Sequence, residues 1–570
     1  MIGVAASPAD YPAVSEFFEL IKTPWELLKS GCHYDVVLCS GDPGLHPASE
    51  FAKVLLVYSG RELASDAANG IAILTRGTKN VLCRKDASIP IYGQYVTFEG
   101  GPNEADLIES TSGHAATCRY ANENQLVVRV GYDIFQEVRT LLKSGQPVEY
   151  AQIPTLELHI ALLRGLILEA GISLIEVPPM PVGYPFVACL THDIDHASIR
   201  MHRWDHTMLG FLFRATLGSM RSFIRGAMPF GDLLTNCTAA LRLPFVYSGL
   251  APDFWRDFGS RYRSAERGCR STFFVIPYRN RPGRENGGSA PRYRASGYAV
   301  SDIADAIKEL VADGFEVGLH GIDAWSDSSS GRRELDEVER AIGAPVAGTR
   351  MHWLYFDEES PAKLEQAGAS YDSTVGYRET VGYLAGTTQA YKPLAARELL
   401  ELPLHAMDTA LFYPCYLGLT QKQAVQRIEE LAQTVEDLGG CLTINWHDRS
   451  LAPERLWYHA YCKTVECLRQ HGAWFATGRE ASAWFRKRRA IVFEKDPVTG
   501  AIIARVTGLH DACLPSMRLR TYKGGLRREQ ADACQPEYFE QSISEGMCSA
   551  PEDANSLMNA AGVSDAVLSS

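Results

Sequence analysis

Two aspartates, Asp193 and Asp195, stand one residue apart at the end of an apolar run, residues 186–190. Alternating residues of a strand point to the same side, so both carboxylates should emerge together from one strand end. Two carboxylates at such a place are costly unless they bind a metal or transfer a proton. The alternative is an ordinary polar cap between a strand and a loop. The pair by itself leaves both interpretations open.

Polar side chains also follow the other apolar runs in this part of the chain. These residues are His320, Arg350, His352, Asp372, His405, Asp408, His447 and Asp448. One such histidine would more often be a hydrogen-bonded structural residue. Their recurrence at successive strand ends indicates a common site, because the carboxyl ends of parallel strands lie at one edge of a sheet or barrel.

Strands and helices alternate around these residues, from about residue 183 to residue 488. Predicted strands cover residues 271–276, 315–320, 400–404 and 441–445, and the helices between them include residues 300–313 and 422–438. Repeated βα units of this kind favour a (β/α) barrel, in which functional residues lie at the carboxyl ends of the strands.

These segments, taken in order, resemble the polysaccharide deacetylases, the NodB-homology carbohydrate esterases, in a divergent form. The matching segments are Thr191-His-Asp-Ile-Asp195, Ser271-Thr-Phe-Phe-Val275, Glu316-Val-Gly-Leu-His320, Gly348-Thr-Arg350, Tyr371-Asp-Ser-Thr374 and Asn445-Trp-His447. The resemblance covers roughly residues 183–480 and depends on the order and spacing of the motifs together. It implies a distorted (β/α) barrel and metal-dependent removal of N- or O-acetyl groups from a glycan.

The resemblance implies a role for each residue of the first motifs. Asp193 would be the base that takes a proton from water, and Arg350 would orient it by a charge-assisted hydrogen bond. Asp195 and His320 would bind a divalent metal ion, zinc or else cobalt, manganese or nickel. The metal would polarise the acetyl carbonyl and lower the pKa of a water molecule.

The resemblance also implies roles for later residues. His447, in the family's final motif, would protonate the departing amine. Asp372 would pair with His447 and keep it charged, and Asp408 is the alternative partner. Trp353 and Trp446 stand close to these motifs, so we predict that they stack on sugar rings, although an isolated tryptophan is more often part of a core.

The chain departs from the family pattern in two places. The family usually has a second metal-binding histidine four residues after the first, where this chain has Ala324, and Ile194 separates two aspartates that are usually adjacent. A third ligand must therefore come from elsewhere, or the site is inactive. We favour His352, because a residue two positions after Arg350 would share its side of the strand. The alternatives are Asp323, His196 and His405.

The connection between Asp195 and Ser271 is much longer than a usual βα connection. Its arginines at 214, 221 and 225 are spaced to lie on one face of a helix, and its apolar residues include Leu209, Phe213, Leu217, Met220 and Ile224. We predict that this helix covers the mouth of the barrel as a lid. The alternative is a basic amphipathic helix, residues 207–228, that contacts an anionic membrane surface.

Residues 1–180 alternate apolar runs with helical stretches and predict an N-terminal α/β domain with a largely parallel sheet. The runs are residues 36–39, 54–58, 71–74 and 127–130, and the clearest helix is residues 155–170. No motif reveals the role of this domain, so a scaffold or a docking surface is the simplest expectation.

Pro178-Pro-Met-Pro181 marks the boundary between the N-terminal domain and the barrel, residues 183–488. After the barrel, the pattern predicts a small β-rich extension at residues 489–540 that begins with a hairpin. Residues 541–570 contain few bulky apolar groups and are predicted to be a disordered tail.

Composition excludes several classes of protein. A net charge of −12 argues against a nucleic-acid-binding protein. The 14 cysteines are scattered without paired spacing, which suits a reducing compartment. The N-terminus lacks the pattern of a signal peptide, and no apolar stretch is long enough to span a bilayer. We therefore expect a cytoplasmic protein that could associate with a membrane.

Together these observations predict a hydrolase that removes acetyl groups, N-acetyl above all, from a saccharide, and so acts on carbon–nitrogen bonds. The missing signal peptide and the resemblance favour a place in surface-polysaccharide biosynthesis. Two alternatives remain open. One is a hydrolase of another amide, including a cyclic one, and the other is a catalytically silent barrel that binds glycan or serves as a scaffold.

Overall fold

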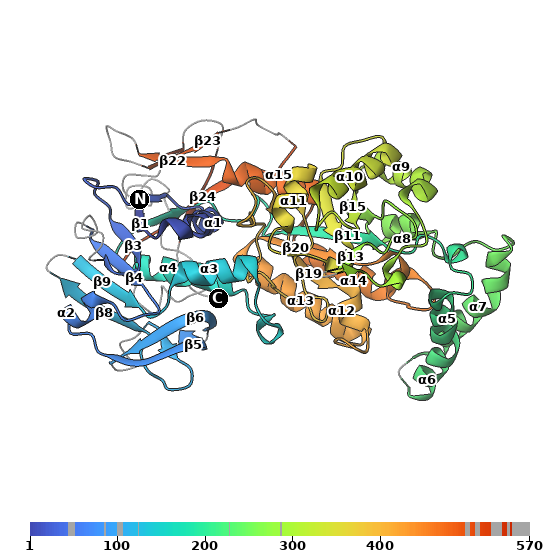
Figure 1. Cartoon of the computed structure of the whole chain (residues 1–570), viewed down its shortest axis with the longest axis horizontal. Coiled ribbons are helices and arrows are strands. Elements are labelled where there is room, and N and C mark those ends of the chain that lie inside the picture. Colours follow the sequence, from blue (N-terminus) through green and yellow to red (C-terminus); the bar gives the residue numbers. More distant parts are fainter. Residues whose placement is uncertain are drawn as a thin grey trace, which may run out of the picture. The chain divides into compact units, whose positions relative to one another are not determined.

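The structure is a computed structural model, and it forms two compact units (Figure 1). It describes residues 1–43, 52–84, 87–99, 106–122, 125–226, 228–285, 288–495, 502–507, 513–525, 538–543 and 548–549. The first unit comprises residues 1–141, 155–182 and 484–570, and the second comprises residues 142–154 and 183–483. The C-terminal segment therefore groups with the N-terminal sheet.

The second unit is built on a curled parallel sheet in the strand order β18-β17-β16-β15-β12-β11-β20-β19, with β21 paired to β11. Its strands are β11 (Val187–Ile194), β12 (Thr272–Val275), β15 (Glu316–Gly321), β16 (Gly348–Met351), β17 (Tyr371–Asp372), β18 (Leu400–Glu401), β19 (Leu404–Met407), β20 (Cys441–Asn445) and β21 (Trp474–Phe475). Every residue of β11 is buried, as is typical of a central parallel strand. The predicted (β/α) barrel class is confirmed.

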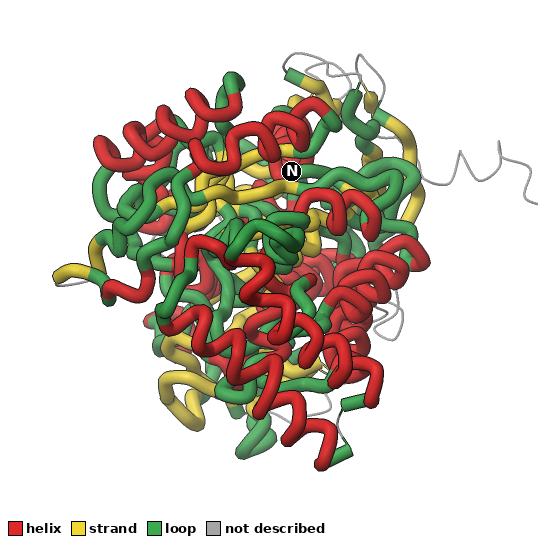
Figure 2. The backbone as a smooth tube through the Cα atoms, turned by 90° about the vertical axis from the view of Figure 1, so that its right-hand side faces the viewer, coloured by secondary structure: helices red, strands yellow, loops and turns green. Residues whose placement is uncertain are grey.

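Helices lie outside the strands of this sheet (Figures 1 and 2). They include α8 (Phe258–Ala265), α9 (Ala304–Ala312), α10 (Ser328–Ile342), α11 (Ser360–Ala367), α12 (Asp408–Phe412), α13 (Gln421–Leu438) and α14 (Tyr458–Gln470), and α15 (Gly478–Arg489) leads into the first unit. Helix α13 shows why these sequences become helical. Thr420 and Gln423 cap its first turn reciprocally, and Ile428, Leu431 and Val435 repeat at helical spacing and are buried.

The predicted strand at residues 400–404 is two short strands, β18 and β19. Pro403 lies between them, and a proline has no backbone N–H with which to pair in the interior of a sheet. The interruption places β18 and β19 at opposite ends of the strand order, although only two residues separate them in the chain. A bridge between Gly376 and Leu404 links the two ends of the curled sheet.

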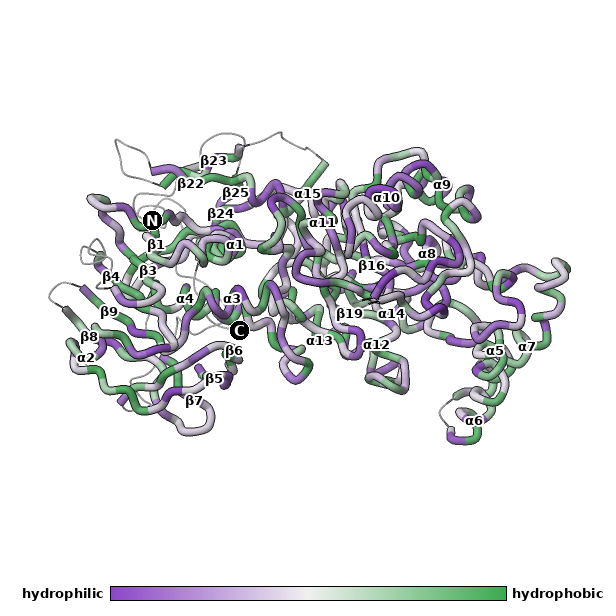
Figure 3. Tube along the Cα trace, viewed as in Figure 1, coloured by the Kyte–Doolittle hydropathy of each residue, from purple (hydrophilic) through white to green (hydrophobic). Residues whose placement is uncertain are grey.

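The long connection after β11 folds into a helical insert within the second unit. It contains α5 (His206–Phe213), a π-helical segment (Arg214–Gly218), α6 (Ser219–Ile224) and α7 (Phe230–Tyr247), and hydrophobic stretches run along these helices (Figure 3). The insert has a small core of its own, in which Met208, Phe211, Leu243 and Trp255 are buried. The predicted helix is present as residues 206–224, which are helical throughout with a π-helical segment between α5 and α6, and α7 is a further helix beyond it.

The first unit contains a six-stranded sheet in the order β2-β1-β3-β4-β9-β8, parallel except for the last pair. Its strands are β1 (Ile2–Ala5), β2 (Trp25–Leu27), β3 (Val36–Ser40), β4 (Val54–Tyr58), β8 (Thr117–Asn122) and β9 (Gln125–Val130), and its helices include α1 (Tyr11–Ile21), α2 (Ala64–Ala68), α3 (Ile134–Lys143) and α4 (Thr155–Glu169). The predicted N-terminal α/β class is confirmed.

A separate antiparallel sheet of β6 (Ala87–Phe98), β5 (Ile73–Arg84) and β7 (Ile108–Glu109) adds to the first unit. The predicted parallel strand at residues 71–74 is instead the beginning of β5. Side chains along the first half of β5 alternate between exposed and half-buried. A strand that is covered on one side only is typical of antiparallel sheets.

The C-terminal region is β-rich, as predicted, and belongs to two small sheets. In the first, β22 (Ile491–Lys495) pairs with β23 (Ile502–Val506), and β26 (Cys548–Ser549) follows. In the second, β24 (Arg518–Tyr522) lies between β10 (Leu174–Glu176) and β25 (Tyr538–Ser542). The predicted hairpin turn at residues 496–500 and most of the predicted tail lie outside the described residues. Among the helices that the structure describes, none combines the length and the hydrophobicity needed to cross a bilayer.

Candidate metal and catalytic site

The carboxyl ends of β11, β15, β16 and β20 surround a pocket of about 550 Å³. The lining includes six of the site residues predicted from the sequence, namely Asp193, Asp195, His320, His352, Trp353 and His447. They come from different strands of one sheet, which is how a parallel barrel assembles a site from distant parts of a chain.

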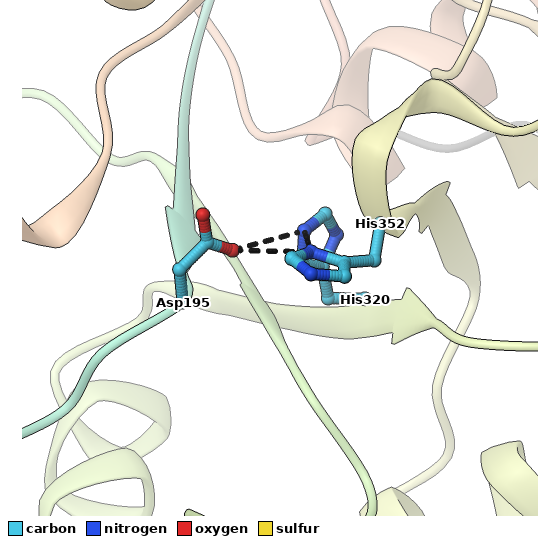
Figure 4. Close-up of side chains that lie close together, drawn as sticks. All are labelled: Asp195, His320 and His352. Atoms are coloured by element: carbon cyan, nitrogen blue, oxygen red, sulfur yellow. Dashed lines mark hydrogen bonds and ion pairs between the residues drawn. The ribbon is translucent and has the colours of Figure 1, made fainter. Parts of the chain in front are cut away.

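Asp195, His320 and His352 converge on one point in this pocket (Figure 4). Asp195 Oδ1 lies 3.3 Å from His320 Nε2 and 3.3 Å from His352 Nδ1. The two imidazole nitrogens are 3.1 Å apart. Both histidines are buried, with 1% and 6% of their surfaces exposed.

The hydrogen bonds of the two histidines determine which of their nitrogens carry protons. His320 Nδ1 lies 3.0 Å from the carbonyl oxygen of Arg350, and His352 Nε2 lies 3.0 Å from the carbonyl oxygen of Arg294. A carbonyl oxygen can only accept, so each of these nitrogens must donate. Burial lowers the pKa of His352, which favours its neutral ring. In the neutral form of either ring, the other nitrogen carries a lone pair.

Two imidazole nitrogens and one carboxylate oxygen thus face one another, all three able to donate an electron pair to a cation. Asp195 Oδ1 is buried, and among the described residues it has no hydrogen-bond partner. Two imidazoles and a carboxylate are the donors that a catalytic divalent cation such as Zn²⁺ prefers, with backbone carbonyls holding the far side of each ring. The residues present fit a metal ion.

An unusual backbone turn follows His352. Strand β16 ends at Met351, and Trp353 and Leu354 then adopt φ angles of 64° and 51°. A positive φ is uncommon for large side chains, and such strain is often retained where it orients a functional group. His352 therefore enters the pocket from the turn after the strand, rather than from the strand itself.

Asp193 is held by two neighbours. Its Oδ1 accepts from Arg350 at 3.2 Å, and its Oδ2 accepts from Asn445 Nδ2 at 2.8 Å. Arg350 is fully buried and also donates to Thr191 and Ser373. The carboxylate is therefore fixed beside the metal-binding donors, with Oδ2 lying 3.9 Å from His320 Nε2.

His447 is paired with Asp408, the alternative partner in the sequence analysis. His447 Nδ1 donates to Asp408 Oδ1 at 2.6 Å, and Asp408 Oδ2 accepts from the backbone N–H of His447 at 2.8 Å. Burial alone would lower the pKa of His447, but Asp408 raises it to about 10. The ring is therefore charged at neutral pH, and its Nε2 lies 3.8 Å from Asp195 Oδ2.

Asp372 does not pair with His447, which corrects the sequence-based expectation. It accepts from Thr349 Oγ1 at 2.6 Å and from Thr374 Oγ1 at 3.0 Å. Burial raises its pKa. Strand order explains the difference, because β19 lies next to β20 and brings Asp408 to His447, whereas β17 and β20 are separated by four strands.

The two predicted sugar-binding tryptophans have different surroundings. Trp353 is half-buried and lines the pocket, with its ring 5.4 Å from that of Tyr293. Trp446 is fully buried, and its ring packs against Phe412 and Tyr461. Trp446 therefore has no face open to a sugar. Successive side chains point to opposite sides of an extended chain, and Asn445 and His447, on either side of Trp446, point to the site.

The other candidate ligands lie apart from the three converging residues. His196 contacts His202, and Asp323 is held by the backbone N–H of Arg284. His405 is buried and bonded to backbone groups, with its Nδ1 accepting from Thr443 N–H. None of them belongs to the metal-binding group that the described residues form.

Sequence reasoning assigned no role to Asn445, although it quoted the residue within a motif. A signal was present, since Asn445 lies two residues before His447 and the two should share one side of a strand. Its place opposite Asp193 depends on β20 lying beside β11, where Thr191 pairs with Asn445. That neighbour relation cannot be obtained from the sequence of either strand.

Comparisons with known proteins give a likeness of fold. No protein-family model matches the chain, and a search of curated proteins finds no relative. A protein from Mycobacterium smegmatis, provisionally named a polysaccharide deacetylase, is 17% identical, with 55% of this chain and 95% of that chain covered and a TM-score of 0.33. The polysaccharide deacetylase Bc1974 from Bacillus cereus is 13% identical, with coverages of 51% and 91% and a TM-score of 0.24.

A family 4 carbohydrate esterase from Streptomyces lividans, solved in complex with acetate, is 12% identical to this chain. Its alignment covers 56% of this chain and 96% of that chain, with a TM-score of 0.22. Because these identities and TM-scores are low, we base the function proposed below on the site itself.

Proposed function

We propose that the second unit is a metal-dependent hydrolase that removes acetyl groups from a saccharide. The observation that carries this proposal is the convergence of three possible metal ligands, Asp195, His320 and His352, beside the fixed carboxylate of Asp193. A charged histidine, His447, completes the pocket. These are the parts that hydrolysis of an unreactive acyl group needs.

Asp195, His320 and His352 would hold the divalent cation through one carboxylate oxygen and two imidazole nitrogens. Zinc suits this donor set best, and cobalt, manganese and nickel accept similar donors. When bound, the cation would polarise the acetyl carbonyl and lower the pKa of a water molecule. Three protein ligands leave a coordination position open, as in other catalytic zinc sites.

Asp193 would accept the proton of the attacking water. Arg350 and Asn445 each hold one of its carboxylate oxygens, so its orientation is determined before the substrate arrives.

His447 would donate a proton to the departing atom. Asp408 holds Nδ1, which leaves Nε2 free to reach a substrate, and a pKa of about 10 keeps the ring protonated. An amide nitrogen leaves only when it is protonated, so a charged histidine suits an N-acetyl group. O-acetyl hydrolysis uses the same groups with less need for the acid.

Trp353 would provide the face on which a sugar ring stacks. It lies in the pocket wall with Tyr293, and aromatic rings bury large apolar areas against flat partners. A saccharide substrate therefore fits both the polar floor of the pocket and its aromatic wall. A cytoplasmic role in the synthesis of surface polysaccharides is the setting we propose for it.

The first test is metal content, measured by elemental mass spectrometry on wild type, His320→Ala and His352→Ala. His471→Ala is the matched control, because His471 pairs with Glu436 and does not line the pocket. We expect near-stoichiometric metal in wild type and in the control, and little in the two pocket variants. Metal retained in both pocket variants, or absent from wild type after reconstitution, would overturn the proposed site.

Acetate release from a panel of N-acetylated and O-acetylated saccharides then tests the reaction. A cyclic amide belongs in the panel, because ring opening would show a different amide hydrolase. Metal binding with no turnover of any member would instead favour a silent, glycan-binding barrel. The panel therefore separates the three functions that the sequence leaves open.

A further inference from the structure

Five arginines line the pocket beside the aspartates and histidines. They are Arg214, Arg294, Arg378, Arg449 and Arg455. Two of them have clear structural roles. Arg294 donates to the carbonyl oxygens of Ile322 and His352, and the guanidinium of Arg378 lies over the ring of Tyr355.

The other three arginines lack acidic partners in the part of the chain that the structure describes. Arg214, at the start of the π-helical segment of the insert, has Nε and one terminal nitrogen buried without a hydrogen bond. Arg455 donates to the hydroxyl of Tyr413 at 2.8 Å, but its Nε is also buried and unpaired. Arg449 lies over the ring of Trp255 at 5.4 Å.

These three guanidiniums are close enough to repel one another. Burial, Arg455 and Arg449 lower the pKa of Arg214 to about 10. Burial alone would raise the pKa of Tyr413, yet Arg455 and Arg449 lower it. Arg449 and Arg455 therefore repel the charge of Arg214 on this side of the pocket, and an anion bound among them would offset the repulsion.

A nearby acid makes no hydrogen bond to the cluster in the described part of the chain. Glu454 is buried, and neither of its carboxylate oxygens has a hydrogen-bond partner among the described residues. Burial raises its pKa, which favours the neutral form. Buried charges are normally paired, so three unpaired guanidiniums in one cavity indicate a partner that arrives from outside.

The geometry points to a second subsite, formed by Arg214, Arg449 and Arg455, that binds an anionic group of the substrate. Planar guanidinium groups bind phosphate and carboxylate oxygens in pairs, so a phosphate ester or a uronate carboxylate would suit it. Arg449 lies two residues beyond His447, which places the subsite in the same pocket as the proposed catalytic groups. If the proposed function holds, the substrate is an acidic saccharide. The binding of an anion at this subsite does not depend on the proposed function.

Calorimetric titration of the protein with inorganic pyrophosphate and with glucuronate tests the subsite. Because an anion could also bind a metal ion, the titrations include His320→Ala, which lacks a proposed metal ligand. We expect at least one of the anions to bind wild type and His320→Ala equally, and Arg449→Gln and Arg455→Gln to weaken that binding at least tenfold. Arg340→Gln, an exposed arginine on α10, is the matched control.

Thermal unfolding shows whether these variants are folded. Removing one of three like charges should leave the melting temperature unchanged or raise it, and Arg449→Lys should retain part of the binding. The preferred anion identifies the source, with pyrophosphate indicating a phosphorylated saccharide and glucuronate a uronate. Anion binding that is absent, or equal in the two glutamine variants and wild type, would overturn the subsite even if acetate release is intact. If wild type bound the anion but no metal, the proposed function would be rejected and the anion subsite would stand.

The outer surface of the helical insert carries a second and independent signal. Its exposed apolar side chains are Trp204, Leu209, Phe213, Leu217, Met220, Phe223, Ile224, Phe230, Leu234, Leu241, Phe245 and Leu250, with Trp204 86% and Leu250 80% exposed. A contiguous sequence with so many exposed apolar groups is unusual in a protein that meets only water. Hydrophobic stretches on α5, α6 and α7 are visible in Figure 3.

Charge indicates what covers this surface. Residues 204–250 contain four arginines and two acidic residues, Asp205 and Asp232, in a chain whose net charge is −12, and three of the arginines, Arg221, Arg225 and Arg242, are exposed outside the pocket. A pocket of about 470 Å³ between α5 and α7, lined by Met208, Leu212 and Leu243, adds an apolar cavity. We infer that the insert docks on a membrane surface rich in anionic lipids, with apolar side chains in the interface and arginines at the headgroups.

Sedimentation with vesicles tests this docking. Wild type should bind phosphatidylglycerol vesicles, bind phosphatidylcholine vesicles at least tenfold less, and dissociate in high salt. Leu217→Glu and Leu241→Glu should each weaken binding at least tenfold, whereas Leu74→Glu, at an exposed position of the first unit, should not. Equal sedimentation of all variants would overturn the inference. So would light scattering that shows dimers in wild type and monomers in the two insert variants, because a second copy would then cover the surface.

Discussion

The two units place buried charges near the ends of parallel strands in opposite ways. In the first unit, Arg129 on β9 donates to both carboxylate oxygens of Asp66, at 2.9 and 3.2 Å. Its remaining donors bond to the carbonyl oxygens of Ser59, Arg61 and Val130. In the second unit, Asp195 and Arg214 keep buried atoms that have no partner among the described residues. A satisfied pair fixes a fold, and an unsatisfied group is available to a ligand.

Two buried histidines differ in another respect, the charge of the imidazole ring. His159, in the first unit, bonds to the hydroxyl of Tyr132, and burial lowers its pKa to about 3. His447 is also buried in its pocket, but Asp408 raises its pKa to about 10. Burial alone therefore makes a neutral structural histidine, and a buried acid beside the ring makes a proton donor.

The largest expected effect is on catalysis. Asp193→Asn should lower acetate release on the order of 10³-fold, because an amide cannot accept the proton of water. Metal content should stay close to that of wild type. The melting temperature should fall, because the amide oxygen can accept from only one of Arg350 and Asn445 and the buried guanidinium is left with an incomplete partner. Turnover within tenfold of wild type would remove Asp193 from its proposed role and weaken the contrast between the units.

The next effect is on stability, and it concerns the first unit. Asp66→Asn should lower the free energy of unfolding by about 3 kcal/mol, because it leaves Arg129 buried with an incomplete partner. Urea denaturation measures the change, and acetate release per folded molecule should not change. The double variant Asp66→Leu/Arg129→Met should regain most of the stability, since it buries no unpaired charge. A single variant as stable as wild type would show that satisfied and unsatisfied charges do not differ as we argue.

A smaller effect concerns pH. Activity that needs protonated His447 should persist through neutral pH and fall as pH rises through about 10. Asp408→Asn removes the charge that raises this pKa, so the pKa should fall towards or below its ordinary value of about 6.5. Activity at pH 8 should then drop at least tenfold, with much of it recovered at pH 6. If the activity of wild type and of Asp408→Asn fell at the same alkaline pH, a group other than His447 would donate the proton.

Much of the site was predictable because strand-end residues are visible in the sequence. Asp195 and His320 are predicted as metal ligands by the resemblance to polysaccharide deacetylases, and His352 by its position two residues after Arg350, and the structure brings the three together. The pairing of Asp408 with His447 was left open, because it depends on which strands are neighbours. Strand order is set by packing between distant segments, and no local pattern records it.

The arginines of the pocket were harder to predict for a related reason. Arg449 and Arg455 follow β20 in a short turn and a loop, where sequence patterns are weak, and Arg214 comes from the insert. Sequence placed Arg214 on one face with Arg221 and Arg225, but the π-helical segment at residues 214–218 changes the spacing. The fold class could be predicted because alternating strands and helices repeat over many residues. The antiparallel pairing of β5 could not, because its first residues have the same short apolar pattern as a parallel strand.

The smallest expected effect tests the comparison most directly. Asp195→Asn, measured in metal-free protein, should change the free energy of unfolding by no more than about 1 kcal/mol, against about 3 kcal/mol for Asp66→Asn. The amide N–H can donate to the lone pairs of His320 and His352, which offsets the lost attraction to His447 at 3.8 Å. Metal binding should nevertheless be lost, so the same variant would be neutral without metal and defective with it. A loss as large as that for Asp66 would mean that Asp195 stabilises the fold itself, and the division between structural and ligand-binding charges would then fail at its central residue.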